Sequence, residues 1–104
     1  MQQASLTMKK CSFGLGGNAP FIVFDDADIE QAVNGLMAGK FRASGQTCVS
    51  PNRVFVQDGV HDRFVAAVRE RVGRNMQYKP FDHPDAVMGS LINTAAADKV
   101  ERLV

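Results

Sequence analysis

The sequence predicts an α/β fold in which largely parallel strands are flanked by helices. Short apolar runs alternate with longer stretches whose apolar residues recur at helical spacing. Turn-forming and helix-capping residues separate the two kinds of segment. The resulting order is strand, strand, helix, strand, helix, helix, and a helix between two strands favours parallel pairing because it returns the chain to the same end of the sheet.

The first half of the chain predicts two strands and one helix. Residues 11–15 alternate between apolar and small side chains, which is typical of a strand with one apolar face. Residues 21–24 read Phe-Ile-Val-Phe, a continuous apolar run expected of a strand buried on both faces. Asp28 is a suitable helix N-cap because Gln31 follows in capping-box register, and the helix is expected to end near Ser44–Gly45.

The second half predicts one further strand and two helices. Residues 53–57 have strand character, and Asp58–Gly59 is expected to form a turn. A helix with one apolar and one charged face is expected from about His61. Residues 75–85, which contain two prolines, are expected to be irregular, and Thr94 is expected to cap a last amphipathic helix.

The length of 104 residues corresponds to one small domain or to part of a larger one. The last amphipathic helix reaches the final residue without a C-cap. Complete domains rarely end in this way, so the sequence predicts that the chain is a portion of a larger domain.

The composition limits the classes of partner. Hydrophobic residues make up 45% of the chain, and the net charge is +1 with acids and bases intermixed. This balance gives no electrostatic reason to expect nucleic acid or an anionic membrane as a partner. No apolar run approaches the length of a membrane span, and no signal peptide is visible. The two cysteines imply no disulfide framework, so a cytoplasmic location is expected.

Cys48 is the leading candidate for a chemically active residue. A lone cysteine is most often a small buried residue. Cys48, however, lies in a polar loop over residues 45–52, and Gly45 would let the backbone approach a ligand. A nucleophilic cysteine must be accessible and must reach the thiolate form. Local reasoning leaves both interpretations open, since neither His61 nor His83 is close in sequence.

Two other features have ordinary structural alternatives. Gly16–Gly17 fits either a tight turn or a close approach of the backbone to a cofactor. Arg42, near the end of the first long helix, fits either a solvated charge that interacts with the helix dipole or a ligand-binding group. The sequence contains neither a Gly-x-Gly-x-x-Gly motif nor a Walker loop, and no cluster of His, Cys, Asp or Glu has metal-ligand spacing.

Three consecutive motifs together resemble the aldehyde dehydrogenase superfamily, and most closely its succinate-semialdehyde dehydrogenases. Residues 13–20 read Phe-Gly-Leu-Gly-Gly-Asn-Ala-Pro, residues 21–28 read Phe-Ile-Val-Phe-Asp-Asp-Ala-Asp, and residues 40–48 read Lys-Phe-Arg-Ala-Ser-Gly-Gln-Thr-Cys. The motifs occur in the order and at the separation found in that family. The resemblance runs from about Lys9 to the end of the chain and implies that residues 1–104 are part of the catalytic domain.

The resemblance implies roles for three positions. Cys48 would attack the aldehyde carbon, and the resulting thioester would be hydrolysed to the carboxylate. The glutamate that serves the family as general base stands at the position of Gly14, which has no side chain. Arg42 would bind the distal carboxylate of the substrate, for which a planar guanidinium is well suited. Such a variant is expected to form the thioester but to release the acid slowly.

The resemblance also implies NAD or NADP as cofactor, with Leu15 and Gly16 as candidate contacts, and a homo-oligomeric full enzyme. The dinucleotide-binding and oligomerisation parts are not expected within residues 1–104. The chain alone is therefore expected to be inactive and to bind no NAD. Position 50, where some relatives carry a second cysteine, is Ser50, and residues 78–82 and 88–92 also depart from the family pattern.

These departures leave a non-catalytic alternative open. The chain would then be a degenerate remnant that survives as a small folded module. Its exposed strand edges and uncovered apolar surface would favour self-association.

Overall fold

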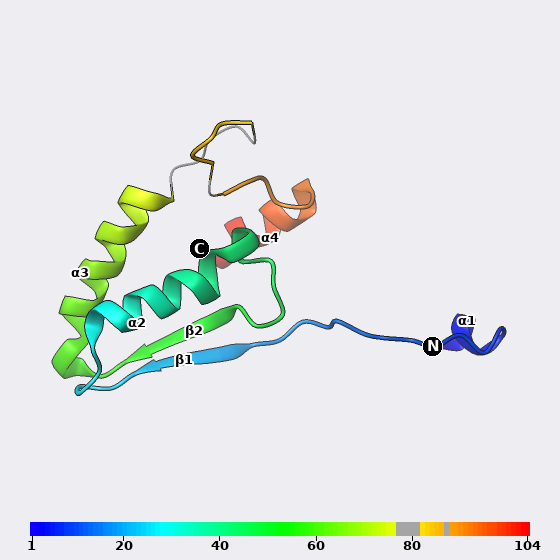
Figure 1. The fold of residues 1–104 in the computed structure, drawn as a ribbon, viewed down its shortest axis with the longest axis horizontal. Helices are drawn as coiled ribbons and strands as arrows, with labels where there is room; N and C mark the ends of the chain where they lie inside the picture. Colours follow the sequence, from blue (N-terminus) through cyan, green and yellow to red (C-terminus); the bar gives the residue numbers. More distant parts are fainter. Residues whose placement is uncertain (77–81, 87) are drawn as a thin grey trace.

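Figure 1 shows the computed structural model of the chain, which describes residues 1–76, 82–86 and 88–104. A small helix–sheet body occupies one end, and an extended amino-terminal arm leaves it. The regular elements, in chain order, are α1 (Gln2–Ser5), β1 (Ala19–Val23), α2 (Ile29–Leu36), the π-helical turn Met37–Phe41, the 3-10 segment Arg42–Gly45, β2 (Pro51–Val56), α3 (Asp58–Asn75) and α4 (Thr94–Leu103).

The two strands pair in parallel, which confirms the predicted fold class. Phe21 pairs with Val54 and Val23 with Val56, and the register shifts between Ala19 and Pro20. The helix α2 connects the strands, and α2 and α3 lie together on one face of the sheet (Figure 1). A parallel pair requires such a crossover because its strands run in the same direction.

The start of α2 follows the predicted cap. Asp28 has extended backbone, and its side chain accepts a hydrogen bond from the Gln31 backbone N–H at 3.0 Å. The helix ends close to the predicted position, but its last two turns change geometry. The chain winds as a π-helical turn over Met37–Phe41 and then as a 3-10 segment over Arg42–Gly45.

The predicted strand at residues 11–15 is wrong. These residues belong to the arm and have no strand partner among the described residues. Phe13 and Leu15 are 57% and 72% exposed, so the alternating pattern faces no core. Alternation describes a surface that a sheet could bury, but a strand also needs a neighbour to satisfy its backbone groups.

The second half needs three smaller corrections. The predicted turn at Asp58–Gly59 is wrong, because Asp58 is the first residue of α3, three residues before the expected start. The strand β2 begins at Pro51, two residues early. Asn93, and not Thr94, caps α4, since its Oδ1 accepts from the Ala96 backbone N–H at 2.9 Å. Of the stretch 75–85 expected to be irregular, residues 77–81 lie outside the described residues.

The core is small and lies between the sheet and the α2–α3 layer. Its buried apolar residues are Val23, Val33, Leu36, Val60 and Phe64.

At the rim of this core, Arg71 of α3 binds Glu30 and Asn34 of α2, each at 2.6 Å.

The expectation that residues 21–24 are buried on both faces is wrong, because Ile22 and Phe24 are 56% and 57% exposed. Helices cover the sheet on one side only.

The chain is much less compact than a closed domain of its size. Its radius of gyration is 17.6 Å, whereas about 13 Å is typical of 104 folded residues. Its accessible surface is 8463 Å², against about 5,700 Å² for a compact protein of this mass. The exposed arm, the uncovered sheet face and α4, which has no buried residue, all contribute to this excess. None of the helices in the described part of the chain combines the length and the apolar character that a membrane span requires.

Candidate active site

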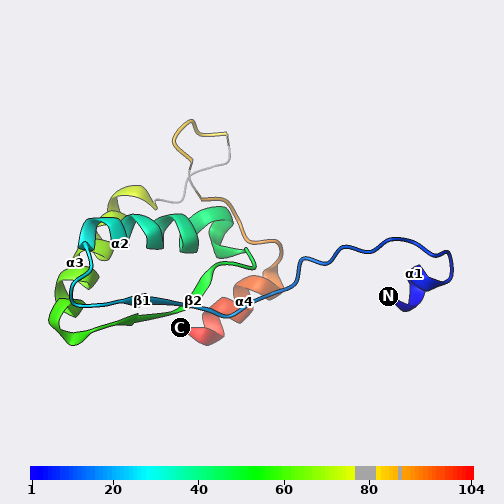
Figure 2. The same ribbon diagram turned by 60° about the horizontal axis from the view of Figure 1, so that its bottom comes forward.

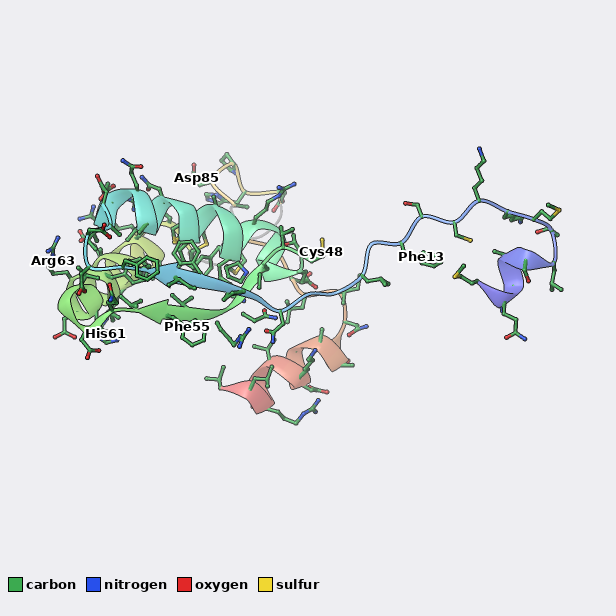
Figure 3. The ribbon with its side chains drawn as sticks, turned by 90° about the horizontal axis from the view of Figure 1, so that it is seen from below. Phe13, Cys48, Phe55, His61, Arg63 and Asp85 are labelled. Atoms are coloured by element: carbon green, nitrogen blue, oxygen red, sulfur yellow. The ribbon has the colours of Figure 1, made fainter. Side chains whose placement is uncertain are left out.

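Cys48 lies in a tight turn between the 3-10 segment and β2. The Ser50 backbone N–H donates to the Thr47 carbonyl at 3.1 Å, which closes the turn around Cys48 and Val49. The Cys48 thiol is free and exposed. Figure 3 shows it at the end of the helix–sheet body from which the arm departs. The exposure of Cys48 argues against the alternative of a small buried core residue and gives the thiol the accessibility that a nucleophile requires.

The backbone just before this turn is held in an unusual conformation. Ala43, Ser44 and Gly45 have φ values of 50°, 56° and 74°. The left-handed region costs a residue with a side chain about 1–2 kcal/mol. Gly45 avoids this cost, and a Cβ added there would also lie 3.2 Å from the Lys40 carbonyl oxygen. Two strained residues therefore direct the chain out of the helix and into the Cys48 turn.

Hydrogen bonds to a distant segment brace these strained residues. Ser44 Oγ donates to the Gly89 carbonyl at 3.0 Å. The Gln46 side-chain oxygen accepts from the Ile92 backbone N–H at 3.1 Å, and its amide nitrogen donates to the Ala43 carbonyl at 3.3 Å. The segment that leads into α4 therefore fixes the approach to Cys48.

Two hydroxyl groups flank Cys48 inside the turn. Ser50 is buried, and its Oγ donates to the Lys40 carbonyl at 3.4 Å. Thr47 Oγ1 is buried without a hydrogen-bond partner among the residues that the structure describes. An unsatisfied buried hydroxyl costs about 1–3 kcal/mol. Thr47 is therefore a point where an additional polar group would stabilise the turn.

The arm meets the Cys48 turn at Gly17. A Cβ added at Gly17 would lie 2.6 Å from the Cys48 carbonyl oxygen, a distance that real Cβ atoms do not reach. Asn52 Nδ2 donates to the Gly17 carbonyl at 3.2 Å, and the Arg53 guanidinium donates to the Asn18 carbonyl at 3.4 Å. Two side chains of β2 thus hold the arm against the backbone of the candidate nucleophile.

The structure does not place the other predicted arm residues against Cys48. A Cβ added at Gly14 or Gly16 would meet nothing within 4 Å. Leu15 is 72% exposed, and Figure 3 shows Phe13 well along the arm, away from Cys48. The described residues leave Leu15 and Gly16 open to solvent, and their expected contacts with a dinucleotide stay a prediction.

Arg42 lies at the junction of the π-helical turn and the 3-10 segment, six residues before Cys48. Its backbone is extended, with φ −55° and ψ 136°, so the helical path is interrupted there. The side chain is exposed and takes part in no hydrogen bond or ion pair with the described residues. Its guanidinium is therefore available for a ligand carboxylate.

Sequence reasoning missed Asn52 and Arg53, and it considered Gly17 only as a turn residue or a cofactor contact. The pairing of Ala19 with Pro51 explains the contacts of these residues, because it brings the residues just before β1 alongside the first residues of β2. That pairing is not visible in a single sequence. No group of three or more His, Cys, Asp or Glu side chains in residues 1–76, 82–86 and 88–104 could hold a metal ion.

Comparisons with known proteins agree on one family. The model of the aldehyde dehydrogenase family matches residues 1–104. The chain is 52% identical over 101 residues to a probable succinate-semialdehyde dehydrogenase [NADP(+)] of Sinorhizobium fredii, covering 97% of this chain and 20% of that protein. It is 50% identical over 101 residues to the succinate-semialdehyde dehydrogenase [NADP(+)] of Escherichia coli, covering 97% of this chain and 21% of that protein.

Solved structures of similar enzymes contain the same fold. A crystal structure of succinate-semialdehyde dehydrogenase from Burkholderia pseudomallei superposes with a TM-score of 0.85 at 46% identity, covering 97% of this chain and 21% of that one. The chain thus spans about a fifth of the length of the relatives that it matches.

Proposed function

This chain belongs to the aldehyde dehydrogenase family, and we propose that it supplies the nucleophile of an enzyme that oxidises an aldehyde to a carboxylate. Residues 1–104 would be part of the catalytic domain, with the dinucleotide-binding and oligomerisation parts outside them. The observation that carries the proposal is the exposed, free thiol of Cys48 on a braced turn.

The proposed reaction begins with addition of the Cys48 thiolate to the aldehyde carbon. A carbon–sulfur bond forms, and the π electrons of the carbonyl move to its oxygen. The backbone N–H of Cys48 has no acceptor among the described residues, so it is available to stabilise that oxyanion. The tight turn positions this N–H next to the sulfur that attacks.

We propose succinate semialdehyde as the substrate and Arg42 as the residue that binds its carboxylate. A guanidinium can form two parallel hydrogen bonds to a carboxylate, which fixes both position and orientation. The exposed and unpaired state of Arg42 supports this role, and so do the names of the similar enzymes from Sinorhizobium fredii and Escherichia coli.

Those names specify NADP(+), which leads us to propose NAD or NADP as the hydride acceptor of the whole enzyme. Leu15 and Gly16 are the candidate contacts for that dinucleotide, and we derive no hydride-transfer step from them. Position 14 bears instead on the release of product. Without a carboxylate there, water would attack the thioester without a general base, so hydrolysis of acylated Cys48 is expected to limit turnover.

A graft into a similar enzyme tests the proposal. Residues 1–104 would replace the matching segment of the Escherichia coli succinate-semialdehyde dehydrogenase, and NADPH formation would be followed with succinate semialdehyde. We expect activity that Cys48→Ser abolishes and Cys11→Ser preserves, since Cys11 is an equally free and exposed thiol on the arm. A graft that folds, stays active with Cys48→Ser and loses activity with Cys11→Ser would reject the proposal.

The non-catalytic alternative has one observation in its favour. The uncovered face of the sheet exposes Ile22, Phe24 and Phe55 at 50–57% each. Apolar side chains gathered on one open face favour association with another surface. If the isolated chain is a self-associating module, light scattering of the purified protein will give twice its monomer mass or more, and Phe24→Ser with Phe55→Ser will return it to the monomer.

A further inference from the structure

A cleft lies between α4 and the first residues of β2, beside residues 44–46 that precede the Cys48 turn. It has a volume of about 780 Å³ and extends to Met88 and Leu91 and to the loop at Gly45–Gln46. Small-molecule sites usually occupy roughly 300–1,000 Å³. Figures 2 and 3 show α4 near the amino-terminal end of β2, apart from the α2–α3 layer. We call this space the α4 cleft; neither Cys48 nor Arg42 lines it.

The charges on the walls of the α4 cleft have one sign. Lys40, Arg53 and Lys99 line it, and no acidic residue is among the described residues that do. Lys40 and Lys99 form no ion pair with any residue in the described ranges. Arg53 is held in place by its bond to the Asn18 carbonyl and by the Phe55 ring, 5.7 Å from its guanidinium carbon. Three cations without a counter-charge favour an anionic occupant.

The remaining walls are largely apolar. Val100 and Leu103 of α4 line the cleft although they are 49% and 76% exposed, and α4 has no buried residue. Met88 and Leu91 form the adjoining wall. The apolar side of α4 therefore faces open space where a helix of this kind would normally pack against a core.

We propose that the α4 cleft binds an organic anion that carries an aliphatic chain, such as a medium-chain carboxylate. The carboxylate lies among Lys40, Arg53 and Lys99, and the chain covers Val100 and Leu103. Complementarity of charge and of apolar surface selects this ligand class over a small dianion or a cationic amphiphile. Each methylene that is fully buried strengthens binding roughly fourfold, so chain length sets the affinity. This proposal is independent of the role of Cys48.

Calorimetric titration of the purified chain with decanoate tests the inference. We expect one decanoate per chain, with binding at least tenfold tighter than that of decyltrimethylammonium or of succinate. The first comparison keeps the tail and reverses the charge, and the second keeps carboxylates and removes the tail. Equal binding of decanoate and decyltrimethylammonium would overturn the proposal, because a general apolar surface binds both.

Matched variants locate the site. Lys40→Gln with Lys99→Gln should weaken decanoate binding about tenfold, since each exposed charge interaction contributes a few-fold. Lys9→Gln with Lys10→Gln makes the same change in net charge on the arm and should leave binding unchanged. An equal loss in both double variants would contradict the proposal, as would decanoate binding that Ile22→Ser on the uncovered sheet face abolishes.

Discussion

The contact between Gly17 and the Cys48 carbonyl gives the most specific mutational prediction. Gly17→Ala would place a Cβ 2.6 Å from that oxygen. Ordinary contacts begin near 3.4 Å, so the arm or the Cys48 turn must move by most of an ångström. The backbone φ of Gly17 is not positive, so the constraint is this contact and not the torsion angle.

The displacement should cost about 1–3 kcal/mol, the usual range for an atom inserted into a close-packed contact. It also weakens the hydrogen bond from Asn52 to the Gly17 carbonyl, which is 3.2 Å long in the parent chain. Gly14→Ala and Gly16→Ala are matched controls, because a Cβ at either position meets nothing within 4 Å. Both should be neutral or stabilising by up to about 1 kcal/mol, since alanine restricts the unfolded chain.

The measurement is the free energy of unfolding in urea, followed by far-ultraviolet circular dichroism, for the three alanine variants and the parent chain. We expect Gly17→Ala alone to lower it. If the three substitutions have equal effects, the arm does not rest on the Cys48 turn in solution, and the account of this contact is wrong.

Three further predictions concern single side chains. In the active graft, Arg42→Ala should raise the KM for succinate semialdehyde at least tenfold and leave the KM for propanal unchanged. An equal rise in both KM values would refute carboxylate binding by Arg42. Asn52→Ala should destabilise the chain by about 1 kcal/mol through loss of the hydrogen bond to the Gly17 carbonyl. If the losses from Asn52→Ala and Gly17→Ala add in the double variant, Asn52 and Gly17 do not share a contact. Arg71→Ala should lower the free energy of unfolding by about 1 kcal/mol, because Arg71 links α3 to α2. Arg74→Ala should lower it by less than about 0.5 kcal/mol, because the partner of Arg74 is on the same helix. Equal losses in the two variants would contradict the role of Arg71 in joining the helices.

Local signals in the sequence predicted the local features of the fold. The Asp28 cap depends on residues three apart, and the order of strands and helices depends on periodicity, so both could be predicted. The strand expected at 11–15 failed because its formation depends on a neighbouring strand. The turn expected at Asp58–Gly59 failed because Gly-containing pairs are also tolerated in the first turn of a helix.

The candidate site likewise has features that the sequence predicts and features that depend on long-range packing. Cys48 and Arg42 lie in one contiguous motif, so the resemblance could predict a role for each from the sequence. The packing of Gly17 against Cys48 joins residues 31 positions apart. It depends on strand register, which a single sequence does not specify. The α4 cleft likewise needs Lys40, Arg53 and Lys99 to meet from three separate elements.

The central claim is that Cys48 carries the acyl group during aldehyde oxidation and that glycine at position 14 slows its release. The most direct measurement is mass spectrometry of the graft, quenched during turnover of succinate semialdehyde with NADP⁺. We predict one succinyl group on the peptide that contains Cys48, at near-full occupancy with Gly14 and at low occupancy with Gly14→Glu, together with faster steady-state turnover in the latter. An unmodified Cys48 in an active graft, or equal occupancy and turnover in the two forms, would contradict this account.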